Sequence, residues 1–161
     1  GLGAGKQVEV LRKNSFESLK SLLPPPSRRG LVLMDPSYEL KTDYDEVVDC
    51  VLDALKRFPT GTYAIWYPVI ARPEAHAMAR KLKTLSTQHQ RSWVQAELAV
   101  GHTPDGTPVK TGARPATQMR ASGMHIINPP FTLAAQLREA LPVVLSHLKG
   151  KVGSGWTVEH R

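Results

Sequence analysis

The sequence predicts an α/β fold built on a mainly parallel sheet. Apolar runs of strand length alternate with stretches whose apolar residues recur at helical spacing, a pattern typical of βαβ units. Residues 31–34 (Leu-Val-Leu-Met) are apolar without interruption, which suits a strand covered on both faces. A chain of 161 residues is long enough for one domain with its own core.

Short-range signals predict the individual elements. Asp43 and Glu46 have the spacing of a capping box, and Pro59 stops the helix that follows them. Pro142 lies inside the last predicted helix and should bend or divide it. Helices are predicted at residues 15–23, 43–58, 73–85 and 132–148, and strands at 8–11, 31–34, 62–67, 93–100, 124–127 and 156–159, the last at a sheet edge. Residues 1–7 are predicted to be a flexible segment, residues 101–116 a polar loop, and residues 8–161 part of a single domain.

The chain carries a basic excess. It has 21 Lys and Arg against 14 Asp and Glu, a formal net charge of +7. This favours a polyanionic partner, with nucleic acid as the first candidate, although a solvated basic surface without a partner is the alternative. Cys50 is the only cysteine and the six histidines are scattered, so we expect no disulfide and no metal. No apolar run approaches the roughly 20 residues that cross a bilayer, and we expect a cytoplasmic protein.

The tetrapeptide Asp35-Pro36-Ser37-Tyr38 directly follows the apolar run. Ligands of such sheets collect beyond the carboxyl ends of the strands, which points to Asp35, Tyr67 and Asn128. A site that methylates the adenine amino group needs acceptors for its two hydrogens. Asp35 can supply a carboxylate, Pro36 a carbonyl, and Tyr38 a ring that lies flat against the base. The alternative is an ordinary Asp-Pro turn.

Three segments together resemble the RlmJ family, bacterial enzymes that methylate N6 of an adenine in large-subunit ribosomal RNA. They are residues 28–44, which contain the tetrapeptide, residues 61–68 (Gly-Thr-Tyr-Ala-Ile-Trp-Tyr-Pro) and residues 122–131 (Ser-Gly-Met-His-Ile-Ile-Asn-Pro-Pro-Phe). The resemblance runs from about Val8 to Glu159. It implies a Rossmann-like class I methyltransferase fold with an antiparallel part at the C-terminus, S-adenosylmethionine as donor, and a catalytic role for Asp35.

The sequence departs from the family in two respects. Ser37 stands where the family usually has proline, which leaves Asp35 and Pro36 in place. The glycine-rich cofactor loop lies upstream in the family and is missing here. We therefore expect an N-terminally incomplete, substrate-side part of the domain that is inactive alone. Asn14 and Ser15 fall where the family has an acidic residue and a glycine near the cofactor, although Asn14 could equally cap a helix.

Other residues are predicted to assist substrate binding. Tyr67 ends a strand at the ligand edge, Ser37 lies within the motif, and Arg28, Arg29 and Lys41 flank it as candidates for phosphate contact. Asn128 is better explained as a turn residue than as a second amino-group acceptor. Methylation of DNA adenine or of a protein amide remains an alternative, as does a catalytically silent RNA-binding domain. We expect RNA as partner and a monomer.

Overall fold

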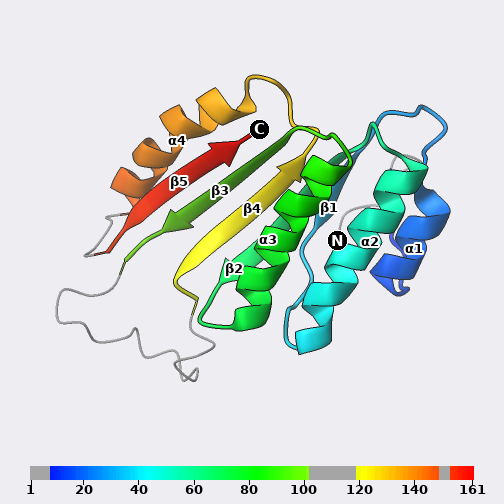
Figure 1. Cartoon of the computed structure of the whole chain (residues 1–161), viewed down its shortest axis with the longest axis horizontal. Coiled ribbons are helices and arrows are strands. Elements are labelled where there is room, and N and C mark those ends of the chain that lie inside the picture. The colour runs from blue at the N-terminus through cyan, green and yellow to red at the C-terminus, as the bar shows by residue number, and fades with distance from the viewer. Residues whose placement is uncertain (1–7, 102–118, 149–152) are drawn as a thin grey trace.

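The computed structural model describes residues 8–101, 119–148 and 153–161. These residues form one five-stranded sheet and four helices, a mixed α/β arrangement (Figure 1). The predicted flexible segment 1–7 and most of the predicted loop 101–116 lie outside the described residues. In chain order the elements are α1 (Ser15–Leu22), β1 (Leu31–Met34), α2 (Lys41–Arg57), β2 (Thr62–Val69), α3 (Pro73–Gln88), β3 (Trp93–Ala99), β4 (Ala121–Ile127), α4 (Leu133–His147) and β5 (Gly155–His160).

The strands lie in the order β1-β2-β4-β3-β5. Only β1 and β2 are parallel neighbours, and the other three neighbouring pairs are antiparallel. The prediction of a mainly parallel sheet is therefore wrong for the described strands, whereas the antiparallel C-terminal part is confirmed. Parallel neighbours require a crossover connection, which is usually a helix. The helix α2 supplies it between β1 and β2, but no described helix lies between β3 and β4, and β4 returns antiparallel.

Strand direction decides which residues meet at each end of the sheet. Because β4 is antiparallel to both β2 and β3, the strands β1, β2 and β3 run the same way. Their carboxyl ends lie at one end of the sheet, which we call the carboxyl edge, and β4 begins there with Ala121 opposite Val69. Residues that follow β4 consequently lie at the opposite edge.

The main core lies between the sheet and the helices α2 and α3, which run side by side over one face (Figure 1). Alternate residues of β2 point into it, with Tyr63, Ile65 and Tyr67 all buried. Val47 and Val51 of α2 meet them in the same cluster, at the spacing that places both on one helical face. This packing anchors the first turns of α2 and α3 near the carboxyl edge.

The opposite face of the sheet is covered unevenly. The helix α4 packs against β3 and β5, where Val94 and Ala96 are buried. On β1, in contrast, the side chains of Leu31 and Leu33 are 67% and 65% exposed, and no described helix lies over them. The strand β1 is also an outer strand of the sheet, with β2 as its one described neighbour.

Three local predictions differ from the structure. Residues 8–11 form no strand, because they pair with no described strand and an isolated extended segment lacks a hydrogen-bonding ladder. The helix α2 begins at Lys41, and the Asp43 carboxylate accepts a hydrogen bond from the Leu40 amide at 3.1 Å, so Asp43 lies inside the first turn. Pro142 does not divide α4, which continues from Leu133 to His147.

Candidate functional site at the carboxyl edge

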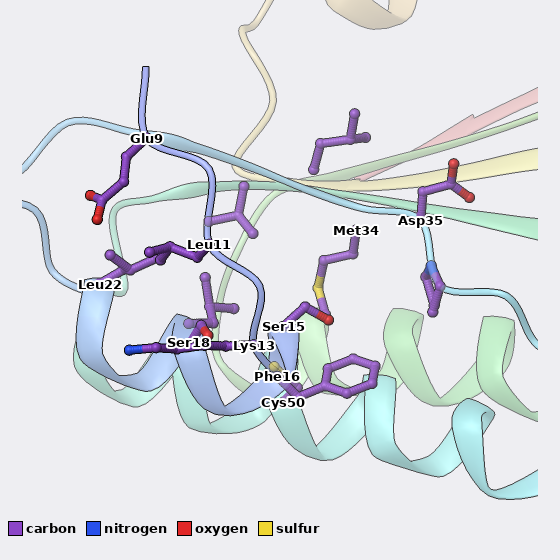
Figure 2. A pocket seen from close by; sticks show the side chains of 14 residues that line it. Glu9, Leu11, Lys13, Ser15, Phe16, Ser18, Leu22, Met34, Asp35 and Cys50 are labelled. Carbon is purple, nitrogen blue, oxygen red and sulfur yellow. The ribbon is translucent and has the colours of Figure 1, made fainter. Parts of the chain in front are cut away.

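Asp35 follows directly after β1 and is exposed at the carboxyl edge. Together with the half-buried Pro36 it borders a cavity of about 500 Å³ (Figure 2). The short strand determines this placement, because Met34 is buried and the alternation of side chains turns the next residue outward. The carboxylate is thus free to accept hydrogen bonds from a ligand.

The rest of the cavity wall comes from β1, α1 and the segment before α1. Ser15 and Phe16 of α1 lie opposite Met34, and Cys50 of α2 contributes behind them (Figure 2). Burial raises the pKa of the Cys50 thiol, which keeps it in the neutral form. The volume lies within the range typical of sites for small molecules and cofactors. Two of the predicted cofactor residues, Ser15 and Asp35, therefore border one cavity.

Asn14, the third predicted cofactor residue, caps α1. Its side-chain oxygen accepts hydrogen bonds from the amides of Phe16 at 2.9 Å and Glu17 at 3.3 Å. Those amides are among the unpaired donors that every helix leaves at its first turn. The capping alternative thus accounts for the side-chain oxygen of Asn14, and Asn14 is absent from the wall of the cavity that Asp35 borders.

Tyr38 lies in the interior. Its side chain is 3% exposed, its hydroxyl donates to the Trp66 carbonyl oxygen at 2.6 Å, and its ring packs on Tyr44 with centroids 4.8 Å apart. Burial, as the largest cause, raises the pKa of Tyr38 well above its usual value. The predicted stacking of this ring on a base does not agree with the conformation seen here. The ring instead fixes the loop that follows Asp35 to the end of β2.

Tyr67 is also buried, with 2% of its surface exposed. Its hydroxyl donates to Oε1 of Glu97 at 2.9 Å, and burial raises its pKa. The ring lies so close to Gly123 that a Cβ there would fall 2.4 Å from two ring carbons. The expected substrate contact of Tyr67 is therefore replaced by a packing role, because alternation along β2 directs this residue toward the helices.

The predicted basic and hydroxyl contacts lie at different places. Ser37 and Lys41 are exposed at the carboxyl edge, and Lys41 forms an ion pair of 2.8 Å with Glu74 of α3. Arg28 and Arg29 precede β1, so they lie at the opposite edge. Five residues, 30–34, lie between Arg29 and Asp35, and in extended chain this distance is about 20 Å. The prediction that this pair flanks the site is wrong, because closeness in sequence along a strand becomes distance in space.

Asn128 lies at the opposite edge as well, because β4 runs antiparallel to β2. Its side-chain amide donates to the carbonyl oxygens of Pro59 at 2.9 Å and Gly61 at 2.7 Å. Its φ of 51° lies in the left-handed region that Asn tolerates better than most residues. The structural explanation of Asn128 is confirmed, and the expectation that it shares an edge with Asp35 is wrong.

Two arginines at the carboxyl edge were not predicted as site residues. Arg120 is exposed, and its amide donates to the Val69 carbonyl oxygen at 2.8 Å. Arg72 precedes α3 and donates from Nη1 to the carbonyl oxygens of Tyr38 at 3.3 Å and Glu39 at 3.5 Å. Neither stands beside Asp35 in sequence. Arg72 directly precedes the helix predicted at residues 73–85, and Arg120 lies between the predicted loop and the strand predicted at residues 124–127, so no motif indicated either of them.

His125 is a further titratable group of the described interior. His125 bonds Ser86 Oγ at 3.1 Å and Gln95 Oε1 at 3.3 Å, and burial lowers its pKa to about 3. Among the described residues, no group of three or more His, Cys, Asp or Glu side chains is placed to hold a metal ion. In the same part of the chain no helix is long and apolar enough to cross a membrane.

Comparison with known proteins gives the family. The family described as "Ribosomal RNA large subunit methyltransferase D, RlmJ" matches residues 2–161. Two curated relatives, both named ribosomal RNA large subunit methyltransferase J, are 46% identical over 154 residues (Haemophilus influenzae, 96% of this chain and 50% of the relative) and 43% identical over 142 residues (Escherichia coli, 88% and 46%). The crystal structure of a Legionella pneumophila protein of the family DUF519 superposes with a TM-score of 0.72 at 31% identity, covering 89% of this chain and 48% of that one.

The chain thus spans about half the length of the curated relatives that it matches. The match nevertheless extends over almost all of its own residues and includes every element of the carboxyl edge described above. This chain belongs to the RlmJ family of ribosomal RNA large-subunit methyltransferases.

Proposed function

We propose that this chain is the substrate-side part of an enzyme that transfers a methyl group from S-adenosylmethionine to the N6 amino group of an adenine in large-subunit ribosomal RNA. The observation that carries the proposal is the exposed Asp35 carboxylate beside Pro36, at the carboxyl edge and on the border of a cavity of about 500 Å³. Membership of the RlmJ family and the names of the two relatives support the reaction class.

The adenine amino nitrogen is a poor nucleophile because its lone pair is delocalised into the ring. In the proposed mechanism the Asp35 carboxylate accepts one amino hydrogen and the Pro36 carbonyl accepts the other. These two hydrogen bonds favour a pyramidal nitrogen, whose lone pair is less delocalised into the ring and points toward the donor. The nitrogen would gain the methyl group as the C–S bond of the donor breaks and leaves a neutral thioether, and it would lose a proton, for which the Asp35 carboxylate is the adjacent acceptor. Most of the catalysis is then positioning.

The cavity fits the proposed donor in size and in wall chemistry. Phe16 and Met34 provide apolar surface, whereas Ser15 and Asp35 provide polar groups. This combination is typical of cofactor sites. S-adenosylmethionine would supply a methyl group activated by a sulfonium centre. We propose Ser15 and Phe16 as the residues of this chain that would hold the donor, and Asp35 borders the same cavity.

For the RNA, we propose contacts at the carboxyl edge. Lys41 and the exposed Ser37 follow Asp35 in the chain, and Arg120 lies at the start of β4. Phosphate contacts of this kind position a nucleic acid without reading its sequence. The net charge of +7 agrees with a polyanionic substrate. We further propose that the protein acts in the cytoplasm as a monomer.

The test uses the complete gene product and labelled S-adenosylmethionine, with RNA, DNA and protein offered as substrates. We expect N6-methyladenine in ribosomal RNA, detected by mass spectrometry after nuclease digestion. Asp35→Ala should abolish its formation and leave donor affinity, measured by calorimetry, largely unchanged. Activity near normal in that variant would remove Asp35 from the mechanism.

Asp45→Ala is the matched control. Asp45 is an exposed carboxylate of α2 that pairs with Lys81 at 2.6 Å and does not border the cavity. Its loss should leave the methylation rate intact, because a surface ion pair contributes about 1 kcal/mol or less to stability. Methylated DNA or protein in place of RNA would favour the other methyltransferase alternatives, and donor binding absent altogether would favour a silent RNA-binding domain.

A further inference from the structure

The loop after Asp35 is held in a conformation that the chain would not adopt alone. Tyr38 has a φ of 53°, in the left-handed region that a bulky residue with a Cβ avoids. The hydroxyl of its side chain is fixed by the Trp66 carbonyl. The backbone carbonyl groups of Tyr38 and Glu39 are held by a different residue, Arg72.

Arg72 reaches this loop from another element. It is the residue before α3, and its side chain makes no capping bond to its own helix. Its Nη1 donates instead to the carbonyl oxygens of two consecutive loop residues, Tyr38 at 3.3 Å and Glu39 at 3.5 Å. Both hydrogen bonds are long, and the positive charge of the guanidinium adds an electrostatic attraction to the two carbonyl oxygens.

A second contact joins the same two segments. Lys41, at the start of α2, pairs with Glu74 in the first turn of α3 at 2.8 Å. The Arg72 guanidinium also lies near the Tyr44 hydroxyl, where its charge partly opposes the rise in the pKa of Tyr44 that burial causes. The first turn of α3 is therefore attached to the loop at its carbonyl groups and to α2 beside it.

We propose that Arg72 is a positioning residue for methyl transfer: by holding the carbonyls of Tyr38 and Glu39, it keeps the loop in the conformation that aims the Asp35 carboxylate and the Pro36 carbonyl at the substrate amino group. The inference rests on the proposed function. Without Arg72, Tyr38 relaxes toward negative φ and moves the preceding residues. A displacement of about 1 Å at a reacting centre can lower the rate roughly 100-fold.

The test is a comparison of Arg72→Ala, Arg72→Lys and Arg138→Ala in the complete gene product. Arg138 is the matched control, because it too holds a backbone carbonyl, that of Val158 at 3.2 Å, but from α4 at the far side of the sheet. We expect Arg72→Ala to lower kcat about 10- to 100-fold while the KM values for RNA and donor change by less than about threefold. Arg72→Lys should recover part of kcat, since an ammonium group can still donate to one of the carbonyls.

A second readout separates this inference from the proposed function. Hydrogen–deuterium exchange should be faster in Arg72→Ala across residues 36–41, and unchanged there in Arg138→Ala. A kcat within about twofold of the unaltered enzyme, equal losses in the Arg72 and Arg138 variants, or unchanged exchange in residues 36–41 would each overturn the positioning role. Full activity of Asp35→Ala in the same assay would instead overturn the proposed function, and the exchange result would still decide whether Arg72 holds the loop.

Discussion

Gly123→Ala should destabilise the fold strongly, because Gly123 of β4 lies against the ring of Tyr67. A Cβ at this position would lie 2.4 Å from two ring carbons, far inside van der Waals contact. The ring cannot move easily, since it is 2% exposed and its hydroxyl is bonded to Glu97. Either the strands separate locally or the ring moves and breaks that hydrogen bond.

The size of the effect follows from these two contributions. Overpacking of a core costs about 1–3 kcal/mol, and a hydrogen bond to a charged acceptor contributes about 1.5–3 kcal/mol. Because only part of the second contribution is lost when the ring shifts, we expect the free energy of unfolding to fall by about 2–5 kcal/mol. For a domain of this size that lowers the melting temperature by about 5–20 °C.

The assay is thermal unfolding of each purified variant, followed by circular dichroism. Gly155→Ala is the control, because its Cβ would meet no atom within 4 Å and it also lies in a strand. Tyr67→Leu removes the ring that the new methyl group would strike, so the double variant should be more stable than the sum of the single effects predicts. A melting temperature of Gly123→Ala equal to that of Gly155→Ala, or purely additive effects, would refute the reasoning.

Two further predictions concern protons and phosphates. His125 is neutral in the fold because burial lowers its pKa to about 3. An unfolded His takes up a proton near pH 6.5, so the protein loses stability as the pH falls. The free energy of unfolding, measured by urea titration, should be about 2 kcal/mol lower at pH 5 than at pH 7. His125→Gln should lack that part of the slope, and an unchanged slope would contradict it. Arg120→Ala should raise the KM for RNA about 3- to 10-fold and reduce the salt dependence of binding by about one charge. Arg28→Ala, at the opposite edge, should change both quantities less. Equal effects of the two substitutions, in steady-state assays at several salt concentrations, would contradict the proposal that RNA binds at the carboxyl edge.

The position of Asp35 in the candidate site could be predicted from the sequence because its signal is local. An uninterrupted apolar run followed by Asp35-Pro36 predicts where a strand ends, and the structure places Asp35 exposed at that end. Ser15 was reached through the family resemblance alone, and it borders the same cavity. The strands at residues 62–69 and 121–127 were found for the same local reason, although each is longer than predicted.

The remaining features depend on strand direction and on neighbours, which no local pattern contains. Arg28 lies far from Asp35 because it precedes β1, whereas Asp35 follows it. Asn128 lies far from Asp35 because β4 runs antiparallel to β2, a direction that the sequence alone does not reveal. Tyr67 and Tyr38 are aromatic residues at a strand end and in a loop, where a sequence cannot distinguish a ring that faces a ligand from one that faces the core. The contacts of Arg72 could not be predicted from the sequence, because its partners are backbone carbonyl groups, which every residue carries.

The uncovered side of β1 has a consequence for how the chain behaves in solution. Leu31 and Leu33 present branched apolar side chains to water, and within residues 8–101, 119–148 and 153–161 only β2 pairs with the backbone of this strand. An exposed strand at the side of a sheet is a template to which another strand can pair. Further polypeptide that covers these two leucines would keep the protein monomeric. Without such a cover, rising protein concentration should cause copies to associate along β1 before it affects the carboxyl edge.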